Sequence, residues 1–146
     1  MVGVVLQRVS QASVRVDGET VAQIERGLLL LVGIDMQDTT DLVERMADRI
    51  AVMRVFEDDT GKVNMSTRDA RGTMLVVSQF TLLADTSRGR RPSFVSAARP
   101  EVARELINHF VHRIKEFGYC VEQGRFAMHM LVSLINDGPF TLALES

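Results

Sequence analysis

The sequence predicts an α+β fold: mostly antiparallel or mixed β-sheet, barrel-like in shape, backed by two main helices. Many short apolar runs rich in β-branched residues predict the sheet. Two segments only, residues 41–54 and 100–117, carry apolar side chains at spacings of three and four, which line one face of a helix. No linker, composition shift or internal repeat divides the 146 residues. We therefore expect a single domain spanning residues 1–146, long enough to bury a substantial core.

The first third of the chain predicts four strands. Residues 2–10 are apolar and β-branched, residues 12–17 alternate apolar and polar side chains, and Asp17-Gly18 is a hairpin turn signal. Strands at 20–24 and 28–34 follow. Because the last run is apolar at nearly every position, we expect it to be buried on both faces of the sheet.

The rest of the chain supplies the helices and the remaining strands. Thr39 or Thr40 can cap the helix at 41–54. The helix at 100–117 begins with Pro100 and is followed by Gly118, the usual arrangement of these two residues around a helix. Residues 55–57 run into a turn at 58–61, and further strands are expected at residues 73–83, 119–123, 128–136 and 141–144.

Composition excludes several classes of protein. With 17 Lys plus Arg against 19 Asp plus Glu, the net charge of −2 excludes a broad duplex-binding face but not a local grip on one nucleic-acid end. The basic run 88–91 could provide that grip or be a solvated loop.

The single cysteine, Cys120, excludes an intramolecular disulfide and a Cys-based zinc site. No apolar run approaches the ~20 residues that span a bilayer, and no signal peptide is visible, so we expect a cytoplasmic protein without membrane contact.

Familiar catalytic signatures are absent. The sequence has no glycine-rich dinucleotide fingerprint, no phosphate loop and no Gly-x-Ser-x-Gly elbow. His109, His112 and His129 lack acidic or cysteine partners at metal-binding spacing. We therefore expect no cofactor and no metal, and few side chains that could activate a nucleophile.

Two polar clusters interrupt the apolar pattern. Ser78-Gln79-Phe80-Thr81 lies within the strand expected at 73–83, where unpartnered polar groups would cost about 1–3 kcal/mol each. These residues are either satisfied internally or form the floor of a pocket with side chains and backbone N–H groups facing a substrate. The other cluster, 136–141, is expected to be a turn between the last two strands, as in an ordinary hairpin.

The Gly138-Pro139 pair gives that second cluster a further possibility. A cis peptide bond before proline costs only about 0.5–1 kcal/mol. Such a bond would hold two neighbouring carbonyl groups in a fixed, nearly parallel direction, with no side chain in the way. The pair would then be a rigid pair of hydrogen-bond acceptors.

Four motifs resemble those of the D-aminoacyl-tRNA deacylases, also called D-tyrosyl-tRNA deacylases. They are Ser-Gln-Phe-Thr-Leu at 78–82, Arg-Arg-Pro-Ser-Phe at 90–94, Gly-Arg-Phe at 124–126 and Val-Ser-Leu-x-Asn-Asp-Gly-Pro-x-Thr at 132–141. The resemblance extends to Val5–Val9 and Ala12–Val14 and so covers essentially the whole chain. The chain departs from the family at Val63, where Met is common, and at Phe140, where a small residue such as Val is usual.

The resemblance implies a homodimeric hydrolase with active sites at the subunit interface. Its substrate would be the ester between a D-amino acid and the 3′-terminal adenosine of tRNA, cleaved as chiral proofreading for translation. Glycyl-tRNA would also be accepted, because glycine has no side chain to exclude. The resemblance makes the catalytic residues Ser78, Gln79, Phe80 and Thr81. The substrate-binding residues would be Gly138 and Pro139, inserted from the partner subunit to reject L-amino acids, together with Arg8 and Asn136.

The mechanism has two alternatives. Thr81 could be a nucleophile, but no histidine or lysine is evidently placed to deprotonate it. The second alternative suits this sequence better: backbone N–H groups of Phe80 and Thr81 stabilise the oxyanion, and the 2′-hydroxyl of the tRNA helps to activate water. Arg8 and the run 88–91 would contact phosphates of the acceptor end. Two rival functions are another ester or amide hydrolase without the chiral filter, and a non-catalytic module that binds an RNA end.

Overall fold

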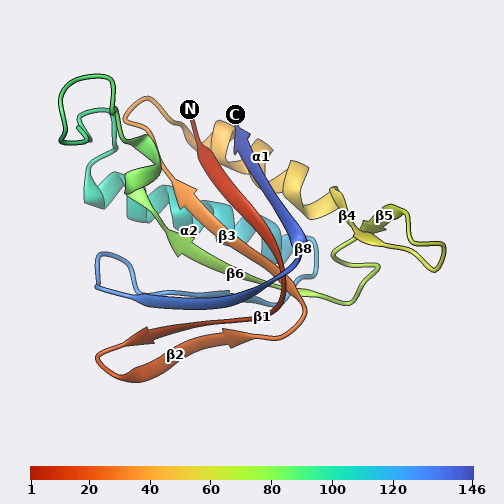
Figure 1. The fold of residues 1–146 in the computed structure, drawn as a ribbon. Coiled ribbons are helices and arrows are strands. Elements are labelled where there is room, and N and C mark those ends of the chain that lie inside the picture. Colours follow the sequence, from red (N-terminus) through yellow and green to blue (C-terminus); the bar gives the residue numbers. More distant parts are fainter.

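The fold, described for all residues 1–146 by a computed structural model, is organised around its long first strand. β1 (Gly3–Val16) pairs antiparallel with β3 (Gly27–Gly33) through its first half and with β2 (Glu19–Ile24) through its second half. On its other side β1 pairs antiparallel with β8 (Leu131–Glu145) over nearly its whole length. The sheet therefore curls around β1 towards a barrel (Figure 1).

Parallel pairing extends the sheet beyond β3. β6 (Thr73–Ser78) lies parallel to β3, and β7 (Val121–Gln123) lies parallel to β6. The strand order is β2-β1-β3-β6-β7, with β8 on β1. A separate antiparallel pair, β4 (Arg54–Glu57) and β5 (Val63–Ser66), projects from one end of the molecule (Figure 1). The predicted α+β class with a mixed, nearly barrel-shaped sheet is confirmed.

Two helices cover one face of the sheet and pack against each other (Figure 1). α1 (Thr40–Val52) begins after Thr39, whose Oγ1 accepts a hydrogen bond from the Leu42 N–H at 3.3 Å. α2 (Pro100–Glu116) starts with its proline, as predicted. Neither helix is long and apolar enough to cross a bilayer.

β3 lies between two apolar layers. Leu28 and Leu30 pack with the helices, whereas Leu29 packs inside the curled part of the sheet with residues of β1, β2 and β6. All three leucines are 0% exposed, which confirms the predicted burial on both faces. This part of the sheet is therefore tightly packed on both faces, and it gives rigid support to the segments that follow β3 and β6.

Several predicted elements were wrong in their extent or their type. Residues 2–10 and 12–17 form one strand, β1, because a single partner, β8, pairs along both. The strand expected at 73–83 ends at Ser78, and Phe80–Leu83 form a 3₁₀ turn, η1. The strands expected at 128–136 and 141–144 form one strand, β8, and the turn expected at 136–141 is a bulge inside it, because residues on both sides of the bulge pair with β1. Neither β4 nor β5 was predicted as a strand.

Candidate active site

The 3₁₀ turn η1 turns the chain away from the sheet at the end of β6. Gln79 still pairs with the sheet, since its N–H donates to the Val32 carbonyl at 2.8 Å. The first backbone hydrogen bond of the turn runs from the Leu82 N–H to the Gln79 carbonyl at 3.2 Å. The N–H groups of Phe80 and Thr81 precede it and have no acceptor within the turn. Two backbone donors are thus available side by side.

Gly33 allows η1 to pack closely on the end of β3. A Cβ at this position would lie 2.6 Å from Leu83 Cδ2 and 2.9 Å from the Gln79 carbonyl oxygen. Since real Cβ atoms do not approach a backbone atom so closely, a larger residue here would displace the turn. The position of the two donors therefore depends on a glycine of the neighbouring strand.

A cleft of about 750 Å³ opens beside η1. Ser78, Gln79 and Phe80 line it on one side, so the structure brings these three predicted catalytic residues to one cavity. The Phe80 ring is 55% exposed and meets Phe94 edge-on, with ring centroids 5.1 Å apart. An exposed aromatic face in a cleft of this size suits a stacked nucleobase.

Sequence reasoning missed several residues that line this cleft. Phe94 and Phe126 lie within the family motifs but were not singled out as site residues, and His129 was considered only as a metal ligand. The motifs themselves contained the signal for the two phenylalanines, because each has arginine and an aromatic residue within a few positions, and both residue types stack on nucleic-acid bases. Nothing in the sequence around His129 links it to Gln79 or Phe80.

The Thr81 hydroxyl is held by its neighbour. The side-chain amide of Gln79 donates a hydrogen bond to Thr81 Oγ1. No histidine, lysine or carboxylate hydrogen-bonds this hydroxyl, so no side chain is in position to take its proton. The contact orders both side chains at the mouth of the turn.

The second predicted cluster is a bulge opposite a single residue of β1. Gln7 pairs with Thr141 and Val9 pairs with Asn136, so residues 137–140 stand opposite Arg8 alone. The peptide bond between Gly138 and Pro139 within it is cis.

Asn136 closes the bulge with its side chain. Its Nδ2 donates to the carbonyls of Arg8 and Phe140 at 2.9 Å each, and its Oδ1 accepts from the Phe140 N–H at 3.1 Å. Three hydrogen bonds within its own chain occupy the amide group. Asn136 is therefore engaged in holding the bulge, which differs from the substrate contact predicted for it.

Arg8 lies beneath the bulge and is only 6% exposed. Its Nε donates to the Asp137 carbonyl at 2.8 Å, and its Nη1 donates to the Val55 carbonyl at 2.8 Å. A buried guanidinium committed to two carbonyls does not fit the phosphate contact predicted for it. The structure instead makes Arg8 a support of the bulge.

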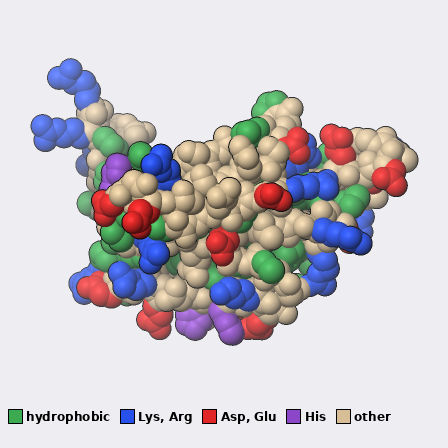
Figure 2. All heavy atoms as spheres, turned by 90° about the horizontal axis from the view of Figure 1, so that it is seen from below, with side chains coloured by type: hydrophobic (Ala, Val, Ile, Leu, Met, Phe, Trp, Pro, Cys, Tyr) green, Lys and Arg blue, Asp and Glu red, His purple; other side chains and the backbone are tan.

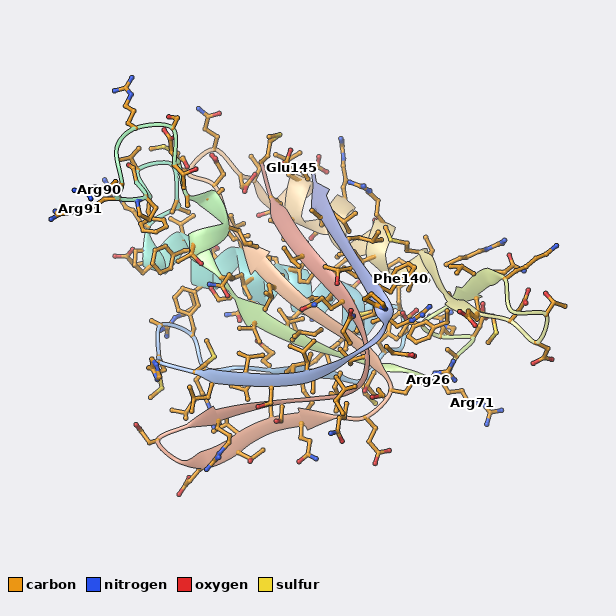
Figure 3. The ribbon with its side chains drawn as sticks, in the orientation of Figure 1. Arg26, Arg71, Arg90, Arg91, Phe140 and Glu145 are labelled. Carbon is orange, nitrogen blue, oxygen red and sulfur yellow. The ribbon has the colours of Figure 1, made fainter.

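Within one chain the bulge and η1 are far apart. η1 packs near Gly3, at the start of β1, where an added Cβ would lie 4.0 Å from Leu82 Cβ. The bulge faces Arg8, five residues further along β1, which is about 17 Å at ~3.3 Å per strand residue. In Figure 3, Phe140 accordingly lies well away from Arg90 and Arg91, which belong to the loop after η1. One chain does not bring the two predicted halves of the site together.

The basic loop, residues 86–92, follows η1 directly. Reciprocal hydrogen bonds between the backbones of Asp85 and Ser93, at 2.7 and 2.9 Å, close its base. Hydrogen bonds from the Ser87 hydroxyl and then its N–H lower the pKa of Asp85 below the ordinary value and hold this carboxylate against the loop. The loop is therefore ordered at its base.

The arginines of this loop are free to meet an anion. Arg88, Arg90 and Arg91 are exposed and make no ion pair. Cationic side chains stand out from one corner of the molecule in Figure 2, and Arg90 and Arg91 point away from the body in Figure 3. Phe94, just beyond the base of the loop, contacts Phe80, so the loop adjoins the mouth of the cleft.

Comparison with known proteins gives consistent results. Residues 5–145 match the family described as D-Tyr-tRNA(Tyr) deacylase. A D-aminoacyl-tRNA deacylase of Alcanivorax borkumensis is 55% identical over 142 residues, 97% of this chain and 98% of that protein. One from Lactobacillus delbrueckii subsp. bulgaricus is 54% identical with the same coverage.

Solved structures agree in fold. A protein named c-Myc DNA Unwinding Element Binding Protein matches with a TM-score of 0.92 and 39% identity, over 99% of this chain and 98% of its own. A structure described as a probable eukaryotic D-amino acid tRNA deacylase matches with a TM-score of 0.82 at 17% identity, over 98% of both chains. The latter likeness concerns the fold alone.

Proposed function

This chain belongs to the D-aminoacyl-tRNA deacylase family and is a hydrolase of the aminoacyl-tRNA ester bond; from this premise we propose that it proofreads chirality with a site built from two subunits. In this proposal the cleft beside η1 receives the 3′-terminal aminoacyl-adenosine of tRNA. The Gly138-Pro139 bulge of a second copy enters the same cleft. The observation that carries the proposal is that the bulge is firmly held yet lies about 17 Å along the sheet from η1 of its own chain. The site of action would be the cytoplasm, where charged tRNA is used.

The free edge of β8 supports a homodimer. None of its fifteen residues is buried, and Leu131 and Ile135 are 58% and 52% exposed. A long strand edge with unpaired backbone groups and exposed apolar side chains is a surface that proteins usually cover. A twofold dimer through this surface would give each cleft the bulge of the other subunit.

The bulge can distinguish D- from L-aminoacyl esters without a pocket that fits the amino-acid side chain. The carbonyl groups around Gly138 and Pro139 would stand beside the α-amino group of the bound ester. An L-amino acid would direct its side chain into these carbonyls, whereas a D-amino acid directs it outward. Glycine has no side chain, so glycyl-tRNA would also be cleaved. Arg8 and Asn136 serve this filter as positioning residues, through the hydrogen bonds that hold its two ends.

The N–H groups of Phe80 and Thr81 would stabilise the oxyanion formed when water attacks the ester. One such donor contributes about 3–4 kcal/mol of transition-state stabilisation, and an aminoacyl ester is already labile. The 2′-hydroxyl of the terminal adenosine helps to activate the water. Ser78, Gln79 and Thr81 position the ester.

We expect Thr81→Ala to retain substantial deacylation, within about tenfold of the wild-type rate, because a positioning hydroxyl contributes a single net hydrogen bond of ~1 kcal/mol. Single-turnover release of a labelled D-amino acid from tRNA measures this rate. Near-total loss of the rate, with tRNA binding intact, would instead make Thr81 the nucleophile.

The basic loop gives a second prediction. Replacing Arg88, Arg90 and Arg91 with Ala should raise KM for charged tRNA and change kcat little, since these residues meet phosphates and not the ester. The slope of log KM against log salt should fall by about 0.7 for each phosphate that the loop no longer neutralises. An unchanged slope would mean that the loop is only solvated. The matched control removes three exposed cations elsewhere: Arg15, Arg45 and Lys115.

The proposed function is tested with one tRNA charged with D-tyrosine and, separately, with L-tyrosine. The proposal predicts fast hydrolysis of the D form and slow hydrolysis of the L form. Equal rates would support the rival hydrolase without a chiral filter. Binding without release of either amino acid would support the rival RNA-end-binding module.

A further inference from the structure

A cluster of alternating arginines and phenylalanines lies behind the Gly138-Pro139 bulge. The Arg26 guanidinium carbon is 5.0 Å from the centre of the Phe56 ring, and that of Arg8 is 6.0 Å from the same ring. Arg8 also lies 4.7 Å from the centre of the Phe140 ring. Arg26 and Phe140 lie at the same end of the sheet in Figure 3. The cation–π cluster therefore joins the segment before β3, β4, β1 and the bulge.

Arg8 carries a buried charge with little ionic compensation. Its guanidinium is hidden from solvent, and the nearest carboxylate, on Asp137, is 3.7 Å away and half exposed. A buried cation needs polar or aromatic partners to offset its loss of hydration. Two carbonyl groups provide some of the partners that the Arg8 guanidinium needs. Of the two aromatic rings beside this guanidinium, that of Phe140 is the nearer. The Phe140 ring thus helps to keep the guanidinium where it is.

The position of this guanidinium fixes the bulge at one end. Arg8 Nε holds the carbonyl of Asp137, the residue before Gly138. Asn136 holds the N–H and carbonyl of Phe140, at the other end. The contact between the Phe140 ring and Arg8 connects these two supports. A change at Phe140 can therefore move both ends of the filter together.

We propose that Phe140 is a specificity-determining residue, whose ring sets how strictly the bulge rejects L-aminoacyl esters. This inference rests on the proposed function. Phe140→Leu keeps an apolar side chain of similar bulk but removes the π face. Since a cation–π contact shielded from water is a small but directional interaction, we expect the ratio of kcat/KM for L- over D-tyrosyl-tRNA to rise about tenfold.

The test compares this ratio in four proteins: the wild type, Phe140→Leu, Phe140→Tyr and Phe117→Leu. Phe140→Tyr keeps the ring and should stay within about twofold of the wild type. Phe117, which is partly buried against the same core beyond the end of α2, is the matched control and should also leave the ratio unchanged. Loss of folded protein cannot move the ratio, because both substrates meet the same enzyme.

Arg26→Ala provides a variant that opens no cavity, because Arg26 is exposed. It should raise the ratio in the same direction by about two- to threefold. If Phe140→Leu keeps the wild-type ratio, the inference is wrong, although the bulge can still be the chiral filter. If Phe140→Leu does not fold, a wild-type ratio in Arg26→Ala has the same meaning. An equal rise in Phe117→Leu also overturns it. A wild-type enzyme that does not discriminate overturns the filter and the inference together.

Discussion

Phe80→Pro is expected to lower kcat for D-aminoacyl-tRNA on the order of 100- to 1,000-fold, the effect of removing one oxyanion donor. Proline lacks the backbone N–H but suits the first position of a helical turn, where that N–H has no partner within the turn. The preceding residue, Gln79, has φ −141° and ψ 78°, outside the helical region that a following proline disfavours. The substitution therefore removes the donor with little disturbance of η1.

The control for this prediction is Phe80→Ala, which loses the ring but keeps the N–H. Because stacking on an aromatic ring contributes about 1–3 kcal/mol per base, this variant should raise KM about tenfold or more and leave kcat nearly unchanged. Single-turnover hydrolysis at saturating and limiting enzyme separates the two effects. Equal kcat values for the two variants would remove the Phe80 amide from the mechanism.

Gly138→Ala is expected to disable the bulge. The added Cβ would lie 2.5 Å from the Phe140 backbone nitrogen and 3.2 Å from its Cα, so the backbone itself must shift. A displacement of about 1 Å in a group that positions substrate can cost 100-fold, and we expect kcat/KM for the D ester to fall by about this factor. The ratio of L- to D-hydrolysis should rise, because the displaced carbonyls no longer block the L side chain.

Gly3→Ala is the matched control for this glycine substitution. Its Cβ would meet only Leu82 Cβ, at an ordinary contact distance of 4.0 Å. Deacylation and discrimination should therefore both stay at wild-type values. If Gly138→Ala behaves in the same way as Gly3→Ala, the bulge takes no part in the site.

Local pattern predicted much of this fold. Both helices lie where the spacing of apolar residues predicted them, and the uninterrupted run in β3 indicated burial on two faces. The 3₁₀ turn escaped prediction because Phe80 and Leu82 continue the alternation of a strand. What ends β6 is a contact distant in sequence, the packing of Leu83 and Gln79 on Gly33. Residue patterns within one segment do not contain such a contact.

The sequence predicted only part of the candidate site, because the bulge also depends on contacts between residues distant in sequence. The Asn-Asp-Gly-Pro composition is common to hairpin turns and bulges, so only the shared partner β1 distinguishes the two. The burial of Arg8 could have been predicted, however. Val4 and Leu6 are buried on one face of β1, and period-two alternation puts Arg8 on that face as well. An arginine there must find partners inside the protein, and the bulge provides one.

Mixing the Phe80→Pro and Gly138→Ala chains tests directly whether each site is shared between subunits. The two chains are co-expressed with different tags, the mixed dimer is allowed to form at random, and D-tyrosyl-tRNA hydrolysis is compared with that of each parent. Half of the dimers would be mixed, and each would hold one site with an intact turn and an intact bulge, so we predict recovery of about a quarter of wild-type activity. A mixture no more active than its parents would contradict the account, because both elements would then have to come from the same chain.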